Sequence, residues 1–312
     1  MPKIFRSLEV QSLNIGLTDS VITQDLPKTV LYGLVLSFNV THTNSSGTVV
    51  VSQDTFGEYC DIQLSIDGDL IPVRINLQDL YYINQYLFKN DPITSFFTTA
   101  STQGSSKIEL ILPFAIIGGE VFEDGLLDLR GVGSASLQIT TKSASVFGTN
   151  VASIDSGSLG VQTLEYANVP VVANQFARTE YSFTDHSITA TGITNFSLAY
   201  GGDQQYRGLL LQTKTSSALS DSVVNKFRVT SRSFDYINSD ANFIKTKNKL
   251  ENGQGTTGYY WLSFASGSGH EERVRMTERL DARNLTELFL EIDSAVSSGN
   301  LRILSVKEIY GG

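Results

Sequence analysis

The sequence has few of the residues that join small proteins by covalent or metal links. Its single cysteine, Cys60, excludes a disulfide framework within the chain. Three histidines and one thiol are too few for a structural zinc module of the Cys/His type. We therefore expect a core held by apolar packing, with no cofactor.

Basic residues are in deficit. Lys and Arg number 23 against 32 Asp and Glu, so the formal net charge is −9. General binding of nucleic acid needs a surplus of Lys and Arg to neutralise phosphates. The composition therefore predicts no direct contact with nucleic acid.

Long hydrophobic segments are also missing. The longest apolar run, residues 108–117, contains Glu109 and Pro113 and is far shorter than the roughly 20 residues of a membrane-spanning helix. The segment after Met1 has no unbroken apolar core, so we expect no signal peptide. The sequence predicts a chain that is made in the cytoplasm and meets a membrane only from outside.

Short strand-like runs bounded by Gly, Ser and Asn dominate the sequence instead. Ser and Thr make up roughly a fifth of the residues, and charged residues 18%. Asp67-Gly68 predicts a two-residue hairpin turn, because both residues accept positive φ angles. The runs predict an all-β fold of sandwiches, with strands at 30–40, 59–66, 70–75, 107–114, 134–141, 161–166, 179–183, 188–198, 206–215, 224–230, 259–264, 288–292 and 301–309.

One stretch, residues 76–90, departs from the β pattern. Its apolar side chains recur near a period of 3.6, with Asn76 as a cap, Asp79 in the first turn and Pro92 beyond the end. The pattern predicts a helix set in a long loop.

Similar segments recur in the same order in the two halves of the chain. Residues 31–36 (LYGLVL) match residues 206–211 (YRGLLL), an aromatic residue, a glycine and aliphatic residues at the start of a strand. Chance similarity between strands is the alternative explanation. We expect two domains of the same fold, 1–168 and 169–312, and the further matches are 112–115 with 262–265, 128–139 with 281–292, and 161–166 with 301–309.

A formal GxGxxG pattern occupies residues 253–258. In a dinucleotide-binding fold it would follow an apolar strand and open a helix. Here it follows the polar residues 247–252 (KNKLEN) and runs into the strand-like 259–262, so a Gly-rich loop is the better interpretation.

Catalytic groups are sparse. Asp185, His186 and Ser187 hold the three residue types of a hydrolase triad in a row, but neighbouring strand residues point to opposite faces. We expect His186 to be an exposed or half-buried strand residue. His42 and His270 are predicted to be solvated loop residues.

Acidic and basic clusters remain open to two interpretations. A glycosidase pair or a calcium site would use carboxylates, whereas turns are rich in Asp because its side chain bonds nearby backbone. The sequence assigns no metal. The carboxylate candidates are Glu120, Glu123, Asp124 and Asp128, with Asp67 and Asp69 also as calcium ligands. Two clusters are predicted to be solvated loops or contacts between copies, namely Lys245–Lys247–Lys249 and residues 271–275. Glycosylation sequons begin at Asn39, Asn44, Asn195 and Asn284.

Taken together, the pattern of strand starts and loop sizes resembles the double jelly-roll major capsid proteins of tailless icosahedral viruses. Residues 25–34 (DLPKTVLYGL) are similar to the entry into the first roll in bacterial members of that family. The hairpin at 62–75, the helix-bearing loop after it and the strand at 301–309 fit as well. The resemblance covers nearly the whole chain but includes no catalytic signature.

The resemblance implies a structural protein of the virion and no enzyme. Three chains would form a roughly hexagonal homotrimer that tiles an icosahedral shell around an internal membrane, beside minor capsid and vertex proteins. Residues 2–24 would be an arm that reaches neighbouring copies, or simply a first strand.

A carbohydrate-binding β-sandwich, such as an adhesin or fibre tip, is the alternative function. In that case clustered aromatic side chains would stack on sugar rings. The candidates are Tyr81, Tyr82, Tyr86, Tyr259, Tyr260 and Trp261.

Overall fold

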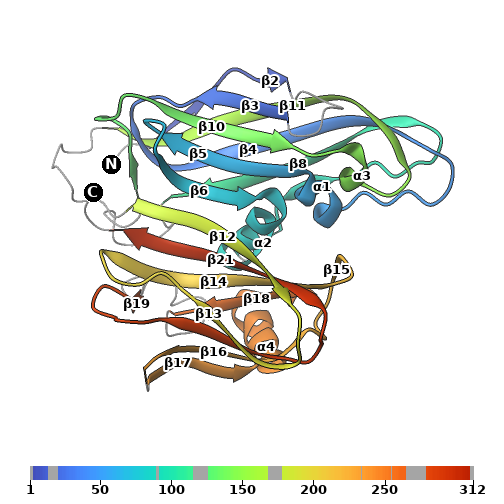
Figure 1. Ribbon diagram of the computed structural model, residues 1–312. Coiled ribbons are helices and arrows are strands. Elements are labelled where there is room, and N and C mark those ends of the chain that lie inside the picture. The colour runs from blue at the N-terminus through green and yellow to red at the C-terminus, as the bar shows by residue number, and fades with distance from the viewer. Residues whose placement is uncertain are drawn as a thin grey trace. The chain divides into compact units, whose positions relative to one another are not determined.

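The strands of the chain fall into two compact units (Figure 1). The computed structural model describes residues 3–12, 20–88, 91–114, 126–167, 178–232, 234–253, 255–264 and 279–309. The first unit holds the strands from β1 to β11 and the second those from β12 to β21. The predicted boundary between residues 168 and 169 lies outside the described residues.

The first unit has two antiparallel sheets. One has the order β1-β11-β4-β8-β7, and the other contains β6-β5-β10-β3. Two short strands are added at β11 and β4, namely β2 and β9. The elements are β1 (Lys3–Ser7), β2 (Gln11–Ser12), β3 (Ser20–Asp25), β4 (Val30–Asn44), α1 (Gln53–Tyr59), β5 (Cys60–Ile66), β6 (Leu70–Asn76), α2 (Leu77–Phe88), β7 (Ile93–Ser95), β8 (Gln103–Pro113), β9 (Leu127–Asp128), β10 (Ala135–Thr141), α3 (Ala144–Phe147) and β11 (Val151–Tyr166).

The second unit repeats this arrangement. One sheet joins β12, β21, β14 and β18, with β15 and β19 paired to β14, and the other has the order β13-β20-β16-β17. The elements are β12 (Arg178–Ile188), β13 (Gly192–Ser197), β14 (Gln204–Thr215), β15 (Ala218–Leu219), β16 (Val224–Ser231), β17 (Phe234–Asp240), α4 (Ala241–Asn252), β18 (Tyr259–Ser263), β19 (Leu280–Asp281), β20 (Phe289–Ser294) and β21 (Gly299–Ile309).

Each unit is therefore an eight-stranded jelly roll, two four-stranded sheets with a helix between the fifth and sixth main strands. The main strands are β1, β3, β4, β5, β6, β8, β10 and β11 in the first roll and β12, β13, β14, β16, β17, β18, β20 and β21 in the second. The predicted fold class, two consecutive jelly rolls, is confirmed.

The core of the second roll shows how the strand period builds it. Leu209, Leu211 and Ile303 point inward with Phe227 and Leu290 of the facing sheet, and all five side chains are buried. Strand residues alternate between the two faces of a sheet, so the intervening residues lie on the outer face. Burial of each large apolar side chain contributes about 1.5–3 kcal/mol.

The helix predicted at 76–90 is confirmed as α2. The Oδ1 atom of Asn76 accepts a hydrogen bond from the backbone N–H of Gln78 at 2.9 Å, as a helix cap does. Every residue from Leu77 to Tyr86 is buried. The helix is therefore covered on all sides, unlike an amphipathic surface helix.

Two local predictions are corrected. Residues 188–198 are two elements, because β12 ends at Ile188 and β13 begins at Gly192. The hairpin turn spans 67–69, one residue more than predicted, since a register shift precedes it in β5. Asp67 and Gly68 do have positive φ angles of 51° and 81°.

The described parts of the 2–24 segment contain three strands of the first roll, β1, β2 and β3. β1 and β2 pair with β11, and β3 pairs with β10. Main-chain hydrogen bonds along both sheets hold these residues to their own unit. The first-strand interpretation is therefore correct for residues 3–12 and 20–24, and the reaching arm is not.

Candidate functional site

The two rolls share a glycine at the same place in the same ladder. Gly33 of β4 pairs with Leu164, and Gly208 of β14 pairs with Val306. In both ladders the register shifts at the residue before the glycine. A Cβ atom on Gly208 would lie 2.5 Å from the indole of Trp261, so no larger residue fits there.

An Asp-x-Arg turn is repeated with the same geometry. The Arg130 guanidinium donates to both carboxylate oxygens of Asp128, at 2.9 and 2.6 Å, and Arg283 does the same to Asp281 at the same distances. Each arginine holds the pKa of its aspartate below the ordinary value. Asp128 is thus committed to an ion pair rather than to acid–base chemistry.

A buried asparagine in each helix grips the backbone of the adjacent strand. Asn84 of α2 donates to the carbonyl of Ile111 at 2.7 Å and accepts from its N–H at 2.9 Å. Asn248 of α4 makes the same two bonds to Trp261, both at 2.9 Å. Sequence reasoning missed these residues, because an asparagine at the eighth position of a helix carries no signal by itself.

A buried ionic site in the second roll has a different counterpart in the first. The second roll holds an ionic cluster in which Arg279 lies 2.7 Å from Glu308 and Arg207 lies 3.5 Å from the same carboxylate, which is fully buried. At the positions of Arg207 and Glu308 the first roll has Tyr32 and Tyr166, whose ring centroids are 4.8 Å apart. The comparison shows that this position accepts either an ionic or an aromatic pair.

His42 is not a solvated loop residue, contrary to the prediction. It lies on β4, fully buried, with Nδ1 2.8 Å from the Asn44 Oδ1 atom and Nε2 2.9 Å from the Ser106 Oγ atom. Its ring packs against Phe147. Burial lowers the pKa of His42, so the imidazole is a neutral part of a polar network in the core.

The Asp185–His186–Ser187 row forms no triad. Asp185 is paired with Arg302 at 2.7 Å, and His186 is half-buried on β12 beside Phe196 and 3.1 Å from the Thr184 hydroxyl. The row is thus spread over the surface of one strand, as predicted for His186.

The remaining acidic candidates show no metal site. The Oδ1 atom of Asp67 accepts from the backbone N–H of Ser134 at 2.7 Å, which joins the hairpin turn to the next loop. Within the described residues, no three His, Cys, Asp or Glu side chains come together as a metal site would require. Glu120, Glu123, Asp124, His270 and residues 271–275 lie outside the described residues.

The predicted loop at Lys245–Lys249 is helix α4. Lys245 is half-buried and paired with Asp221, while Lys247 lies 3.6 Å from Glu251 one turn later. Gly253, with a φ of 73°, ends the helix as its C-cap, and β18 follows the loop. The GxGxxG segment therefore runs from a helix to a strand, the reverse of a dinucleotide fingerprint.

The aromatic clusters cannot stack on sugars in this chain. All six proposed side chains are buried, none with more than 5% of its surface exposed. The sequon residue Asn39 is exposed on β4, whereas Asn44 is buried. The carbohydrate hypothesis thus loses its proposed contact residues.

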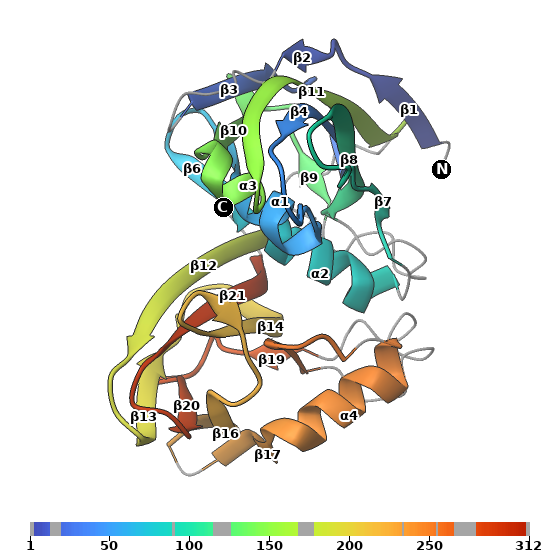
Figure 2. The ribbon, with the colours of Figure 1, turned by 90° about the vertical axis from the view of Figure 1, so that its right-hand side faces the viewer.

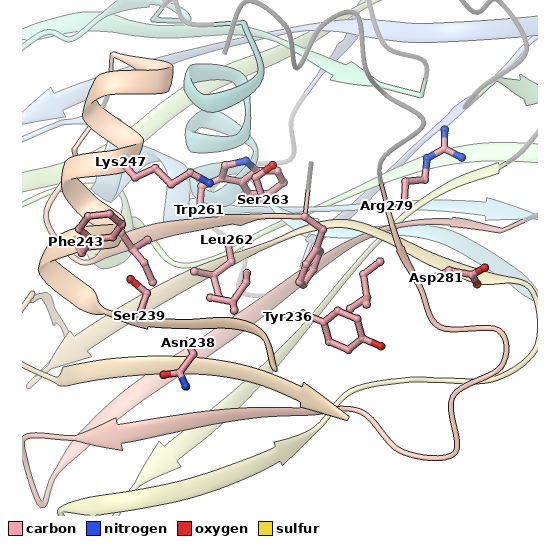
Figure 3. A pocket seen from close by; sticks show the side chains of 14 residues that line it. Tyr236, Asn238, Ser239, Phe243, Lys247, Trp261, Leu262, Ser263, Arg279 and Asp281 are labelled. Carbon is pink, nitrogen blue, oxygen red and sulfur yellow. The ribbon is translucent and has the colours of Figure 1, made fainter. Parts of the chain in front are cut away.

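A pocket of about 800 Å³ lies in the second roll (Figure 3). It is bounded by β17, α4, β18 and β19, with Tyr236, Phe243 and Leu262 among its apolar residues. Its charged residues are already paired within the chain, Arg279 with Glu308 and Asp281 with Arg283.

The described part of the chain contains no helix long and apolar enough to span a bilayer.

The chain matches no protein-family model and no curated protein. Solved structures do match it. The MCP of STIV, the Sulfolobus Turreted Icosahedral Virus, superposes with a TM-score of 0.76 at 13% identity, covering 99% of this chain and 97% of that one. The major capsid protein of bacteriophage PM2 gives 0.67 at 11%, covering 100% and 98%, and a chain of the PBCV-1 virus capsid gives 0.65 at 12%, covering 100% and 95%. At these identities the similarity establishes the double jelly-roll fold over the full chain.

Proposed function

We propose that this chain is a viral major capsid protein that forms homotrimeric capsomers. The observation that carries the proposal is the tandem of two rolls with the same topology, an arrangement that matches capsid proteins over nearly their whole length. The paired glycines, Asp-x-Arg turns and helix asparagines show how closely one roll repeats the other.

The duplication supplies a physical mechanism. Three copies place six similar rolls around a threefold axis, which gives a nearly hexagonal block that can tile an icosahedral facet. Such a protein acts through the area of its interfaces and needs no active site. We place the boundary between its rolls at residues 168 and 169.

The proposal extends to the surroundings of the shell. The capsomers contact each other and minor and vertex proteins, and they face an internal membrane without spanning it. The net charge of −9 leaves genome contact to other components. We further infer a resemblance to the coat protein of a lipid-containing phage of Flavobacterium, whose chain has about this size.

Light scattering after size exclusion tests the proposal. The chain of 34.1 kDa should elute as a stable trimer of about 102 kDa, or as larger shell-like assemblies. A strictly monomeric protein that binds glycans on an array would contradict the capsid proposal and favour the carbohydrate-binding alternative.

A further inference from the structure

The two rolls expose different faces at equivalent positions, and the helices show it first. Asn84 and Asn248 fix the equivalence of α2 and α4, because each bonds the same position of the adjacent strand. Five residues earlier, Asp79 is 1% exposed in α2 but Phe243 is 65% exposed in α4. Two residues later, Tyr86 is 3% exposed but Leu250 is 81% exposed.

The outer faces of the equivalent sheets show the opposite contrast. Leu164 pairs with Phe5 on one side and with Gly33 on the other. Val306 pairs in the same way with Tyr181 and with Gly208. Phe5 and Tyr181 are therefore equivalent. Phe5 is 61% exposed, whereas Tyr181 is fully buried.

A row of paired residues across the outer face of the sheet shows the same contrast as Phe5 and Tyr181. In the first roll the row is half-buried or exposed; in the second it is larger, more apolar and mostly buried. Adjacent strands pair these residues directly, so the rows correspond strand by strand. The rows are Ser7, Gln162, Val35 and Ile111 in the first roll, and Phe183, Leu304, Leu210 and Trp261 in the second.

The first roll thus has a covered helix and an open outer sheet face, and the second roll has an open helix and a covered outer sheet face. We propose that the α4 face of one copy, formed by Phe243, Thr246 and Leu250, binds the outer sheet face of the first roll of a neighbouring copy, centred on Phe5. The interface is head-to-tail, because the two surfaces differ, and head-to-tail contacts form a ring when the rotation between successive copies closes. The inference deepens the proposed function and rests on it for the number of copies.

The chemistry of α4 favours another copy of this chain as the partner. The helix carries three lysines and one glutamate on a chain of net charge −9. Because the chain as a whole is acidic, long-range attraction favours the approach of this basic helix to a second copy. It lies along β16 and β17 (Figure 2), and the pocket of about 800 Å³ beside Phe243 offers space for a large side chain of the neighbour.

The chain also supplies a matched control. Val21 on β3 and Ile193 on β13 occupy equivalent positions, and both are exposed, at 55% and 71%. The proposed interface is predicted from positions whose exposure differs between the rolls, so a position that is exposed in both rolls lies outside it. Ile193→Glu therefore makes the same kind of surface change without touching the proposed interface.

The first test compares oligomer mass. Phe243→Glu combined with Leu250→Glu should shift the protein from about 102 kDa toward 34.1 kDa, with at least a tenfold rise in the concentration needed for half-assembly. Phe5→Glu should do the same, and Ile193→Glu should remain trimeric. Circular dichroism of each variant reports whether it has folded.

Cross-linking provides a second test that does not depend on a disruptive variant. Two tagged chains, one with Phe5→Cys and one with Leu250→Cys, are co-expressed and treated with a short bismaleimide. The native Cys60 is fully buried and does not compete. Cross-linked pairs should contain one chain of each kind.

The outcomes separate this inference from the proposed function. A trimeric wild type whose α4 variants stay trimeric, or whose cross-links join only like with like, would overturn the inference and leave the capsid proposal standing. A wild type that is monomeric at every concentration contradicts both.

Discussion

Replacing Asn248 by alanine should destabilise the second roll strongly. The side chain is 2% exposed and makes two 2.9 Å hydrogen bonds to the backbone of Trp261, one as donor and one as acceptor. Alanine leaves a buried N–H and a buried C=O without these partners. Each such group costs about 1–3 kcal/mol, so the expected loss in the free energy of unfolding is about 2–6 kcal/mol.

The single tryptophan gives a direct assay, because Trp261 is the residue that Asn248 holds. Its fluorescence is followed during urea unfolding at one fixed protein concentration. With a slope of about 2 kcal/mol per molar urea, the midpoint should fall by about 1–3 M. The slope should stay unchanged if the variant loses stability rather than compactness.

Asn242→Ala is the matched control on the same helix. Asn242 is exposed, and alanine is the better helix former, so its midpoint should equal or slightly exceed that of the wild type. If Asn248→Ala unfolds within about 0.2 M of Asn242→Ala, the two bonds contribute no net stability and the reasoning is wrong.

Further predictions concern buried charge. Glu308→Gln leaves Arg207 and Arg279 without their anionic partner, so the free energy of unfolding measured in urea should fall by about 3–5 kcal/mol. The triple variant Arg207→Tyr, Arg279→Leu, Glu308→Tyr introduces the residues of the first roll and should be at least as stable as the wild type. A triple variant less stable than Glu308→Gln would refute the equivalence of the two sites. Burial lowers the pKa of His42 below its value in the unfolded chain, so the unfolded chain binds the proton first as the pH falls. The free energy of unfolding should therefore decrease as the pH is lowered past about 6.5, by at most about 1.4 kcal/mol per pH unit. In thermal unfolding, His42→Gln should remove this part of the pH dependence, and the control His186→Gln should keep it. Equal pH profiles for the wild type and His42→Gln would contradict the assignment to His42.

The sequence predicts the strands and the duplication well, because alternation of buried and exposed residues is a local signal. Residues 206–215 and 301–309 coincide with β14 and β21 to within two residues. The helix α2 was found from its period and its cap. Helix α4 was missed because Phe243 and Leu250 face outward, so its apolar residues do not form one buried stripe.

The internal polar sites could not be predicted in the same way. His42 stands among Ser, Thr and Asn residues that suggest a loop, yet its partner Ser106 is 64 positions away and only the fold brings them together. Asn248 depends on Trp261 in the same manner. Such residues are recognised by geometry across the sheet, which composition and period do not contain.

Electron micrographs of the purified protein test the central claim most directly. The account predicts class averages of a particle with threefold symmetry and six similar rolls around its axis, alone or tiled into shells. Images of single two-roll particles at concentrations where a capsomer should be intact would contradict it.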